Sequence, residues 1–571
     1  PLEQGPSERR AGLLVKRWEL SVDIGETYRL DRIVALHTSR DGGDPVREAL
    51  ERAREAGLGD GRRLVRRHKR SWQRRWQAVD IEIEGDDEAQ RSLRFAAYHL
   101  ISAANPEDER VSIAARTLSG DAYKGHVFWD TDIFILPFFT FTDPPSTRAM
   151  LMYRWHTLPA AREKARSMGY RGALYAWESA DTGEETTPRF MRAPDGEMVR
   201  IVTGEQEHHI SADVAYAVWQ YWAASGDDEF LWAHGAEMLL ETARFWSTRG
   251  RLEEDGRYHI RKVVGPDEYH EGVDDNAFTN LMAGWNLERG LEVARMMAER
   301  RPEAWASLRE RLELRDEELE RWAQLAGAMY VAYDEASGLI EQFAGFHRLE
   351  EFDLRPLRRQ GKRGLPLDLL LGRERTVKTK IIKQADVVMA LHLLWDRFDA
   401  RTRGANFDYY EPRTCHGSSL SPATHAVVAA RLGETAVAEA YFIQAARIDL
   451  ANNMGNAAGG VHAAALGGLW QAAVFGFAGM QLKAEGLLFD PHLPLRWQAL
   501  RFPVKYRGVG LRVEIRQDPL LFRARVEGPG SAFVKLEGGE AKELSAGRDY
   551  VSLGSEAGWG PWEEQQPPEQ G

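Results

Sequence analysis

The stretch GGVHAAALGGLWQAAVFGFAGM, residues 459–480, decides the fold class of this chain. Small residues occupy one face of the predicted helix, and Leu, Trp and Phe occupy another, which indicates burial on more than one side. A helix that is covered all round fits a fold with two concentric layers of helices. This stretch is then expected to belong to the inner layer.

Helical spacing dominates outward from this stretch, from about residue 89 to residue 480. The helical segments come in pairs, and long loops rich in Gly, Pro, Trp and acidic residues separate them. Helix hairpins arranged as an α/α barrel would place such loops on one end face, where chemistry would occur. We therefore predict a mainly α fold with a catalytic barrel over residues 89–483. The clearest helical segments are residues 146–169, 210–225, 227–250 and 279–300.

The two ends of the chain have a different pattern. Residues 1–43 alternate apolar and polar positions and predict two or three strands, interpreted as the remnant of an N-terminal β-sandwich domain. Residues 44–88 have helical spacing with a charged outer face, as in a helical linker. Period-two alternation returns after the barrel and predicts a small C-terminal β-sandwich over 484–555. The polar, proline-bearing residues 556–571 are expected to be disordered.

Composition excludes several classes of function. The 571 residues are 43% hydrophobic and 28% charged, which is typical of a globular protein, and no apolar run approaches the ~20 residues of a membrane helix. A net charge of −12 argues against general nucleic-acid binding. The single cysteine, Cys415, fits a small buried residue in a reducing compartment. We expect a cytoplasmic protein, although the chain begins at Pro1 without an initiator Met, so a preceding segment remains open.

Five polar loop segments combine Trp, acidic residues, Gly and Pro in places where a helical fold does not need them. Most of the 18 tryptophans are expected to fill helix interfaces, so only those within these segments count as site residues. The segments are GHVFWDTDIF (125–134), GALYAWESADTGEETTP (172–188), VVGPDEYHEGVDDNAFTN (263–280), the pair KQADV (383–387) with YEPRTCHGSSLSP (410–422), and GGVHAAALGG (459–468).

The segment at 263–280 contains the best proton donor. Gly265 and Pro266 break the chain and present Asp267 and Glu268 at the expected start of a helix, where crowded carboxylates could raise one pKa toward neutrality. A protonated Glu268 could then donate to a glycosidic oxygen. Acidic residues also favour helix N-termini for electrostatic reasons alone, so this interpretation stays open. The spacing lacks the HExxH pattern of zinc helices, and we expect no metal.

The segment around residue 418 has the groups that bind an anion. Gly417, Ser418 and Ser419 precede a predicted helix, and helix N-termini with exposed N–H groups bind phosphate readily. His416, His462 and Lys383 could add charge. The same segment also fits a helix cap, with Ser421 as the N-cap residue and Pro422 as the first helical residue. A nucleophilic role for Ser418 is not supported, because GxSxG is absent.

With these motifs in the same order, the chain resembles glycoside hydrolase family 65, the maltose, trehalose, nigerose and kojibiose phosphorylases. The resemblance runs from about residue 10 to residue 510 and is carried by YKGHVFWDTDIFILPFF, YAWES, VVGPDEYHE, KQADVV, YEPRTCHGSSLSP and VHAAALGG. Residues 178–188 and 199–221 are most similar to kojibiose phosphorylases and their glucosylglycerol-cleaving relatives. The resemblance implies an (α/α)6 barrel with flanking β-sandwich elements, of which the N-terminal one is incomplete here.

The resemblance also implies roles for single residues. Glu268 of GPDE corresponds to the general acid. The glucosyl unit would be held by Trp129, Asp130, Trp177, Glu178, Lys383 and Gln384, and phosphate by Ser418, Ser419, His462 and Lys383. No organic cofactor and no metal is implied, since inorganic phosphate is a substrate. The implied partners are a small disaccharide and phosphate, without nucleic acid or membrane, and the assembly is expected to be a homodimer.

The expected reaction is inverting phosphorolysis of an α-glucoside, such as a kojibiose-like disaccharide or glucosylglycerol, to β-glucose 1-phosphate. Phosphate is already an anion near neutral pH, so one carboxylic acid suffices where an inverting hydrolase needs two carboxyl groups. The alternative is a hydrolase of the same family, with Glu411 as the base that activates water. A third possibility is a carbohydrate-binding protein that keeps the barrel without turnover.

Overall fold

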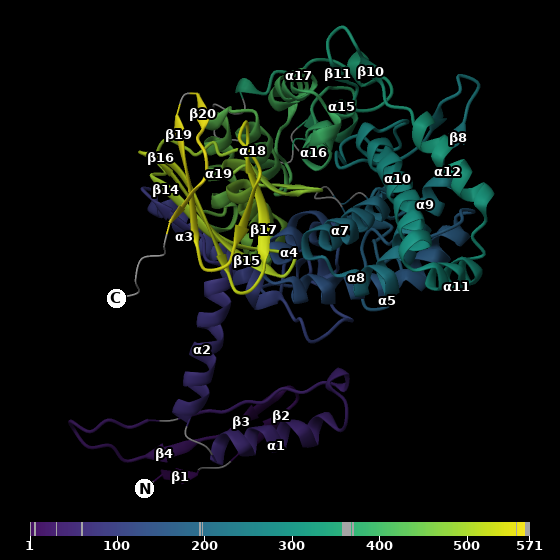
Figure 1. The fold of residues 1–571 in the computed structure, drawn as a ribbon. Helices are drawn as coiled ribbons and strands as arrows, with labels where there is room; N and C mark the ends of the chain where they lie inside the picture. The colour runs from purple at the N-terminus through teal and green to yellow at the C-terminus, as the bar shows by residue number, and fades with distance from the viewer. Residues whose placement is uncertain are drawn as a thin grey trace. The chain divides into compact units, whose positions relative to one another are not determined.

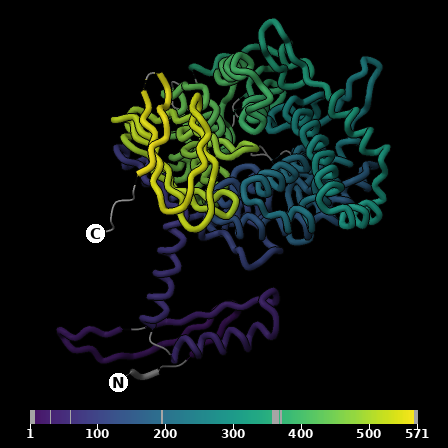
Figure 2. Tube along the Cα trace, viewed as in Figure 1, coloured from purple at the N-terminus to yellow at the C-terminus, as the bar shows by residue number. Residues whose placement is uncertain are grey.

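The computed structural model describes residues 2–4, 7–29, 31–58, 61–192, 196, 198–356, 367, 371–555 and 557–565. The chain divides into two compact units, Pro1–Trp76 and Gln77–Gly571. Figure 1 shows the ribbon of each unit, and Figure 2 traces the chain from purple at the N-terminus to yellow at the C-terminus. No helix in the described part of the chain is both long and apolar enough to span a bilayer.

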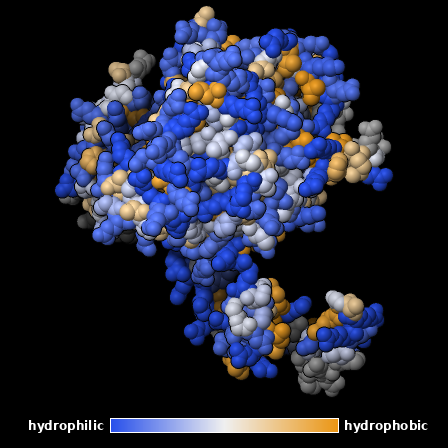
Figure 3. All heavy atoms as spheres, turned by 90° about the vertical axis from the view of Figure 1, so that its right-hand side faces the viewer, coloured by the Kyte–Doolittle hydropathy of each residue, from blue (hydrophilic) through white to orange (hydrophobic). Residues whose placement is uncertain are grey.

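The first unit is small and consists of short strands and helices. Four strands form two antiparallel pairs, β1 (Leu2–Gln4) with β4 (Trp18–Leu20), and β2 (Glu8–Arg10) with β3 (Leu13–Val15). The sequence predicted two or three strands here. Helix α1 (Pro45–Leu58) follows, and α2 (Gly61–Val79) begins in this unit. Many apolar side chains of this unit are exposed, including Leu14 at 63%, and they contribute to the apolar surface that Figure 3 shows in orange.

Six helical segments of the second unit form a closed inner ring. Each packs against the next, and the last packs against the first. They are η3 with α4 (Asp130–Ile135 and Leu136–Thr142), α7 (Ile210–Ser225), α10 (Ala277–Arg300), α16 (Asp386–Leu393), α18 (Ser421–Arg431) and α20 with η9 (Ala463–Gln471 and Ala472–Phe477). The stretch that decided the fold class therefore lies in the inner layer, as predicted.

An outer layer of helices covers this ring. The members are α5 (Pro144–Ser167), α9 (Ala236–Arg249), α12 (Asp316–Ala328), α17 (Ala400–Tyr410), α19 (Thr435–Leu450) and α3 (Asp87–Ala103), with α11 (Pro302–Leu312) beside α10. Helix α3, the first of the barrel, packs against the last inner helix, α20, and beside the outer helix α19, and so joins the beginning of the barrel to its end. The chain thus forms the predicted (α/α)6 barrel.

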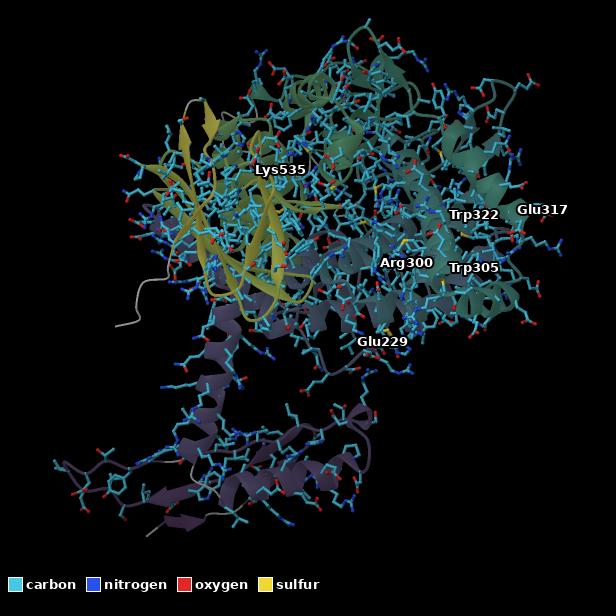
Figure 4. The ribbon with its side chains drawn as sticks, in the orientation of Figure 1. Glu229, Arg300, Trp305, Glu317, Trp322 and Lys535 are labelled. Carbon is cyan, nitrogen blue, oxygen red and sulfur yellow. The ribbon has the colours of Figure 1, made fainter. Side chains whose placement is uncertain are left out.

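Small residues let the layers approach closely. A Cβ on Gly467 of α20 would lie 2.2 Å from the carbonyl oxygen of Phe134, and one on Gly468 would lie 2.7 Å from the Cβ of Ala423 in α18. Gly290 has the same role in α10, where a Cβ would lie 3.2 Å from the ring of Trp322. Trp322 is almost completely buried and comes from the outer helix α12 (Figure 4). The tryptophan thus fills a helix interface, as most were expected to do.

A buried ion pair ties the two layers together. Arg154 of the outer helix α5 donates to both carboxylate oxygens of Asp132 in η3, through Nη2 at 2.5 Å and Nε at 3.2 Å. Both side chains are at most 2% exposed. The same guanidinium also donates to the carbonyl oxygen of Phe128, next to Trp129. The pair therefore fixes the chain just where the first inner helical segment begins.

The C-terminal part is a β-sandwich made of two sheets. One sheet has the strand order β12 (Gln481–Lys483), β13 (Gly486–Phe489), β17 (Ser531–Leu536), β18 (Lys542–Ser545). The other has the order β20 (Gly558–Trp559), β19 (Asp549–Ser555), β16 (Leu520–Glu527), β15 (Val509–Gln517), β14 (Ala499–Tyr506), β5 (Glu82–Glu84), with β21 (Glu563–Gln565) on β19.

Two details differ from the sequence-based expectations. Residues 44–88 were expected to be a helical linker, but they include the strand β5, which pairs with β14 although more than 400 residues separate them. Residues 556–571 were expected to be disordered, but β20 and β21 lie within them and pair with β19. Segments of two or three residues owe their conformation to the neighbouring strand and carry too little alternation to be predicted. Residues 556 and 566–571 lie outside the described part.

The Arg154–Asp132 pair leads to a stability prediction. Replacing Arg154 with Met leaves an uncompensated buried carboxylate and should reduce the free energy of unfolding by about 3–5 kcal/mol. The double variant Asp132→Leu/Arg154→Met should recover most of that loss, because no buried charge remains. Arg512→Met, which breaks an exposed pair with Glu527, is the control and should cost about 0–1 kcal/mol. Urea titration followed by circular dichroism measures all three, and equal losses for Arg154→Met and Arg512→Met would contradict the prediction.

Candidate functional site

The loop before each inner helix lies at the same end of the barrel. Side-chain contacts join these loops, from Lys383 to Glu268, from Arg116 to Gly460, and from His209 to Trp129 and Trp177. A Cβ on Gly417 would likewise lie 3.6 Å from Lys383 Cγ, so the six inner helices all begin at one end of the barrel. Four of the five polar segments chosen from the sequence lead into five of the six inner helices, η3, α10, α16, α18 and α20, because the pair at 383–387 and 410–422 leads into two of them. The fifth segment, at 172–188, lies earlier in the connection from α5 to α7. Residues 203–209 directly precede α7, the sixth inner helix, and the sequence analysis had not chosen them as a site segment.

Glu268 lies in a loop, not at the start of a helix as the sequence analysis expected. The following helix, α10, begins only at Ala277. The carboxylate of Asp267 explains the difference, because it accepts hydrogen bonds from the backbone N–H of Lys383 (2.8 Å) and from Gln342 (3.1 Å), and its Oδ2 lies 2.7 Å from His270 Nδ1. These tertiary bonds hold residues 265–271 against residues 379–386 in a non-helical path.

A cation lies directly beside the predicted acid. Lys383 Nζ donates to Glu268 Oε2 at 2.7 Å, and both side chains are about one-quarter to one-third exposed. Burial lowers the pKa of Lys383, but the Glu268 carboxylate raises it more, so the ammonium stays charged. Gln384 donates to the carbonyl oxygen of Pro266 at 2.6 Å, so the two loops are joined on both sides of Glu268. This arrangement has an acid and an ammonium ready to face a reacting bond.

Two tryptophans lie next to each other in the same site. The ring centroids of Trp129 and Trp177 are 6.4 Å apart, and both rings are buried. The imidazole of His209 packs edge-on against both, at 4.9 and 5.4 Å. Aromatic rings with carboxyl groups beside them suit a pyranose, whose faces are apolar and whose edge carries hydroxyls.

The carboxyl groups beside these rings have shifted pKa values. Burial raises the pKa of Asp130 to about 7, and the nearby Glu268 adds to this shift while Arg116 opposes it. Burial also raises the pKa of Glu178, although His126 Nδ1 lies 2.8 Å from its carboxylate and works against the shift. Glu268 is also among the charges that raise the pKa of Glu178, so both carboxyl groups lie near Glu268.

The loop that contains Ser418 and Ser419 (the serine loop) is adjacent to the loop that contains Glu268 (residues 265–271, the acid loop). Ile382 pairs with Thr414 in a parallel bridge, which places the chain after Thr414 beside Lys383. A Cβ on Gly417 would lie 2.9 Å from the hydroxyl of Tyr269 and 3.6 Å from Lys383 Cγ. The backbone directly before Ser418 and Ser419 therefore lies against the loop of Glu268 and Lys383.

The cap expected at Ser421 is not observed. Helix α18 begins at Ser421, and Leu420 is its N-cap residue. The Ser421 hydroxyl lies 2.9 Å from His416 Nδ1, and His416 Nε2 lies 3.1 Å from the hydroxyl of Tyr441. His416 has φ +56°, which is uncommon for a residue with a side chain, and these two contacts hold it there. His416 thus fixes the serine loop from behind.

His462 is joined to the site through an arginine that the sequence analysis missed. Its Nδ1 lies 2.7 Å from Asp449, and its buried Nε2 has no hydrogen-bond partner in the described part of the chain. Arg116 Nη1 donates to the carbonyl oxygen of Gly460 (2.7 Å) and lies 3.3 Å from His462 Nδ1. Arg116 also acts on the pKa of Asp130 and stacks over the ring of Tyr123 at 5.8 Å.

Other residues of the site were also missed. The pKa of Tyr123 responds to Lys383, Glu268, Asp130 and Arg116, so its hydroxyl lies near all four. Glu207, just before α7, is buried, and neither carboxylate oxygen has a hydrogen bond within the described residues. The one usable signal is position, because each of these residues lies in a loop that leads into an inner helix.

His209, in the same loop as Glu207, carries a buried charge beneath the tryptophans. Its Nε2 lies 3.4 Å from Glu207 and its Nδ1 lies 2.6 Å from Asp213. Burial alone would lower the pKa of His209. The carboxylates of Asp213 and Glu207 outweigh this effect and raise the pKa to about 10. The sixth loop thus places an imidazolium against the two aromatic rings.

The remaining sequence candidates have structural surroundings. Cys415 is buried, and burial raises its thiol pKa to about 11. The Glu411 carboxylate accepts a hydrogen bond from Tyr441, the residue that contacts His416. Glu411, the base of the hydrolase alternative, therefore contacts a residue that supports the serine loop. Among the described residues, no three or more His, Cys, Asp and Glu side chains are grouped so that they could hold a metal ion.

Comparison with known proteins matches this arrangement to one family. The sequence models of the glycosyl hydrolase family 65 central catalytic domain and C-terminal domain match residues 94–471 and 480–541. A kojibiose phosphorylase of Halothermothrix orenii is 42% identical over 530 residues, which cover 91% of this chain and 67% of that protein. An α,α-trehalose phosphorylase of Thermoanaerobacter brockii is 36% identical, over 89% of this chain and 64% of that protein.

Two further relatives agree. A 1,2-α-glucosylglycerol phosphorylase of Bacillus selenitireducens is 35% identical, over 90% of this chain and 68% of that protein. A solved structure described only as a candidate kojibiose phosphorylase from the human microbiome superposes with a TM-score of 0.80 at 25% identity, covering 94% of this chain and 74% of the other. The chain belongs to glycosyl hydrolase family 65.

Proposed function

We propose that this protein catalyses the inverting phosphorolysis of an α-glucoside, with Glu268 as general acid and inorganic phosphate as nucleophile. The observation that carries the proposal is the single site in which Glu268, Lys383 and the serine loop meet. The relatives named as phosphorylases of kojibiose, trehalose and glucosylglycerol support the same reaction.

The protons and bonds balance with one carboxylic acid. Glu268 donates its proton to the departing glycosidic oxygen as the bond from that oxygen to the anomeric carbon breaks. An oxygen of hydrogen phosphate forms a bond to the opposite face of the same carbon, which converts the α configuration to β. The proton of hydrogen phosphate restores the acid. The products are β-glucose 1-phosphate and the free acceptor, and the reaction should run in both directions.

The glucosyl unit would lie against Trp129 and Trp177, with its hydroxyls on the polar groups beside them. Asp130, Glu178 and Gln384 supply acceptors and an amide at the site. We favour an α-1,2 linkage, in kojibiose or glucosylglycerol, because relatives with both names match about nine-tenths of this chain.

Phosphate would be held by Ser418, Ser419, His462 and Lys383, and we add Arg116 to this set. Within the described residues, Arg116 uses Nη1 for its bond to the carbonyl oxygen of Gly460 and for its contact with His462, which leaves Nε and Nη2 for a ligand. A guanidinium binds phosphate oxygens with two parallel hydrogen bonds. The unpartnered His462 Nε2 beside it is a further group that a phosphate oxygen would satisfy.

We further infer from the family a homodimer that acts in the cytoplasm without metal or organic cofactor. Light scattering during size-exclusion chromatography measures the mass of the assembly. Activity after dialysis against EDTA measures any dependence on metal.

The first prediction concerns phosphate and the acid. Kojibiose with phosphate should give β-glucose 1-phosphate, detected by ³¹P and ¹H NMR, whereas phosphate-free buffer should give almost no glucose. Glu268→Gln should lower kcat by roughly 10²- to 10⁴-fold, because no group protonates the leaving oxygen, with little change in disaccharide binding. Glucose release at the same rate without phosphate would establish the hydrolase alternative. Full turnover in Glu268→Gln would move the acid role to another residue, with Glu271 the first to test.

The second prediction concerns Arg116. Arg116→Met should raise the KM for phosphate about 10- to 100-fold, the effect of losing charge-assisted hydrogen bonds worth about 1.5–3 kcal/mol. The KM for the disaccharide should change much less. Arg116→Lys should lie between the variant and the wild type, because it keeps the charge without the planar fork. Equal phosphate KM values for wild type and Arg116→Met would remove Arg116 from the phosphate site.

The third prediction follows from the pKa of Asp130, which is about 7. The ionised fraction of Asp130 rises from about one-tenth at pH 6 to about nine-tenths at pH 8. A carboxylate accepts stronger hydrogen bonds from sugar hydroxyls than a neutral acid, so affinity should rise with pH. Calorimetry with the disaccharide and no phosphate should show a Kd several-fold lower at pH 8 than at pH 6. Asp130→Asn should flatten this dependence, and an unchanged slope in the variant would assign it to another group.

A further inference from the structure

Asp386 is a buried carboxylate that the reaction above does not use. It is the first residue of α16 and is 1% exposed. We propose that Asp386 is a positioning residue, which fixes the loop of Glu268 so that the acid points at the glycosidic oxygen. The proposal rests on the proposed role of Glu268 as general acid.

Both oxygens of Asp386 accept hydrogen bonds from the acid loop and its flank. Oδ1 accepts from the backbone N–H of Asp267, the residue before Glu268, at 2.7 Å. Oδ2 accepts from Asn276 Nδ2 at 2.5 Å, and Asn276 in turn caps α10 by accepting from the N–H of Thr279. One carboxylate therefore ties the acid loop to the first residue of α16 and to the N-cap of α10.

The acid loop lies so close to Asp386 that one position has room only for glycine. A Cβ on Gly265 would lie 2.3 Å from Asp386 Oδ2 and 2.4 Å from Asn276 Nδ2. Gly265 does not have positive φ, so space and not backbone conformation requires glycine here. A shift of the loop away from Asp386 is opposed by the bonds, and a shift toward it is opposed by this contact.

Asp267 extends the same arrangement to Lys383. Its Oδ1 accepts from the backbone N–H of Lys383, and Lys383 Nζ donates to Glu268. The sequence Asp386, Asp267, Lys383, Glu268 is therefore a chain of consecutive hydrogen bonds. It returns to the acid from the opposite side of the loop. Hydrogen bonds therefore hold both the backbone just before Glu268 and the end of the Glu268 side chain.

Two buried carboxylates so close together repel each other, which is costly for a purely structural device. Burial, and to a smaller extent the neighbouring Asp267, raises the pKa of Asp386 to about 8, so ionising Asp386 beside Asp267 is costly. The arrangement therefore fits a requirement of the site better than a requirement of the fold.

The role of Asp386 can be separated from a general structural role by the choice of leaving group. A disaccharide needs a proton on its departing oxygen. In α-glucosyl fluoride the carbon–fluorine bond breaks and fluoride leaves as an anion, while phosphate forms the new bond to the anomeric carbon and releases its proton to solvent. Loss of acid positioning should therefore slow phosphorolysis of the disaccharide far more than that of the fluoride.

The experiment compares kcat for kojibiose and for α-glucosyl fluoride, both with phosphate. Asp386→Asn places an NH2 group against either Asn276 or the Asp267 amide, so one bond is lost. We expect kcat for kojibiose to fall about 10- to 100-fold, as for a misplaced catalytic group, and kcat for the fluoride to fall less than about threefold. The double variant Asn276→Asp/Asp386→Asn exchanges the two groups, restores both bonds and should recover kojibiose turnover to within about threefold of wild type.

Two further variants complete the test. Gly265→Ala should reproduce the effect of Asp386→Asn without changing a charge. Asp549→Asn is the same change at a buried position of the C-terminal sandwich, and it should leave kcat unchanged for both substrates. Equal losses on both substrates, or no loss in a folded Asp386→Asn, would overturn the proposal. If Asp386→Asn does not fold, Gly265→Ala and the double variant test the proposal through the same comparison, the loss in kcat for kojibiose against the loss for α-glucosyl fluoride. Glu268→Gln separates the two claims, because full kojibiose turnover there removes the acid role, whatever Asp386 does.

Discussion

The parallel orientation of the six inner helices is the constraint on which this site depends. Each inner helix starts at the same end of the barrel, so six loops that are far apart in sequence meet there. Glycines in the helices permit the close packing that fixes the ends, as where Gly467 lies against the backbone at Phe134. The loops themselves need no regular structure, and their residues are free to be chosen for chemistry.

The site contains two kinds of charged group, buried carboxyl groups and the cations Lys383 and Arg116. Asp130, Glu178 and Asp386 are carboxyl groups whose pKa values are raised by burial, and each opposes folding when it ionises. Their stabilising contribution is therefore lost as pH rises from the ordinary Asp and Glu values through the raised ones. Lys383 and Arg116 supply positive charge close to these acids, since Lys383 donates to Glu268 and Arg116 opposes the raised pKa of Asp130. The site thus holds carboxyl groups and cations in close proximity, and the buried carboxyl groups lower the stability of the fold when they ionise.

Much of this could be predicted from the sequence, for physical reasons that can be named. Residues 459–480 have no polar face, and this alone predicts that they belong to the inner layer, because a helix buried on all sides must have helices around it. Trp129, Trp177, Glu268 and Lys383 stand out because a helical core does not need Trp beside acids in a loop. Their roles stay a prediction, although the structure brings them together. Arg116 was missed because its partner Gly460 lies more than 300 positions away, and Glu207 was missed because the burial of its carboxylate is set by tertiary packing that no local pattern displays.

The wrong expectations have the same cause. Acidic residues after Gly-Pro favour a helix start, yet Asp267 accepts bonds from Lys383 and Gln342, and residues more than 70 positions away thereby hold the loop. Ser421 before Pro422 fits a helix cap, yet its hydroxyl contacts His416, which holds the left-handed turn of the serine loop. In both places a side chain that local rules assign to a helix end is used to fix a loop. Because these loops are fixed by buried polar contacts, and not by their own conformation, the loop of Glu268 and the loop of Ser418 can be held at a constant separation without any change in the helices behind them.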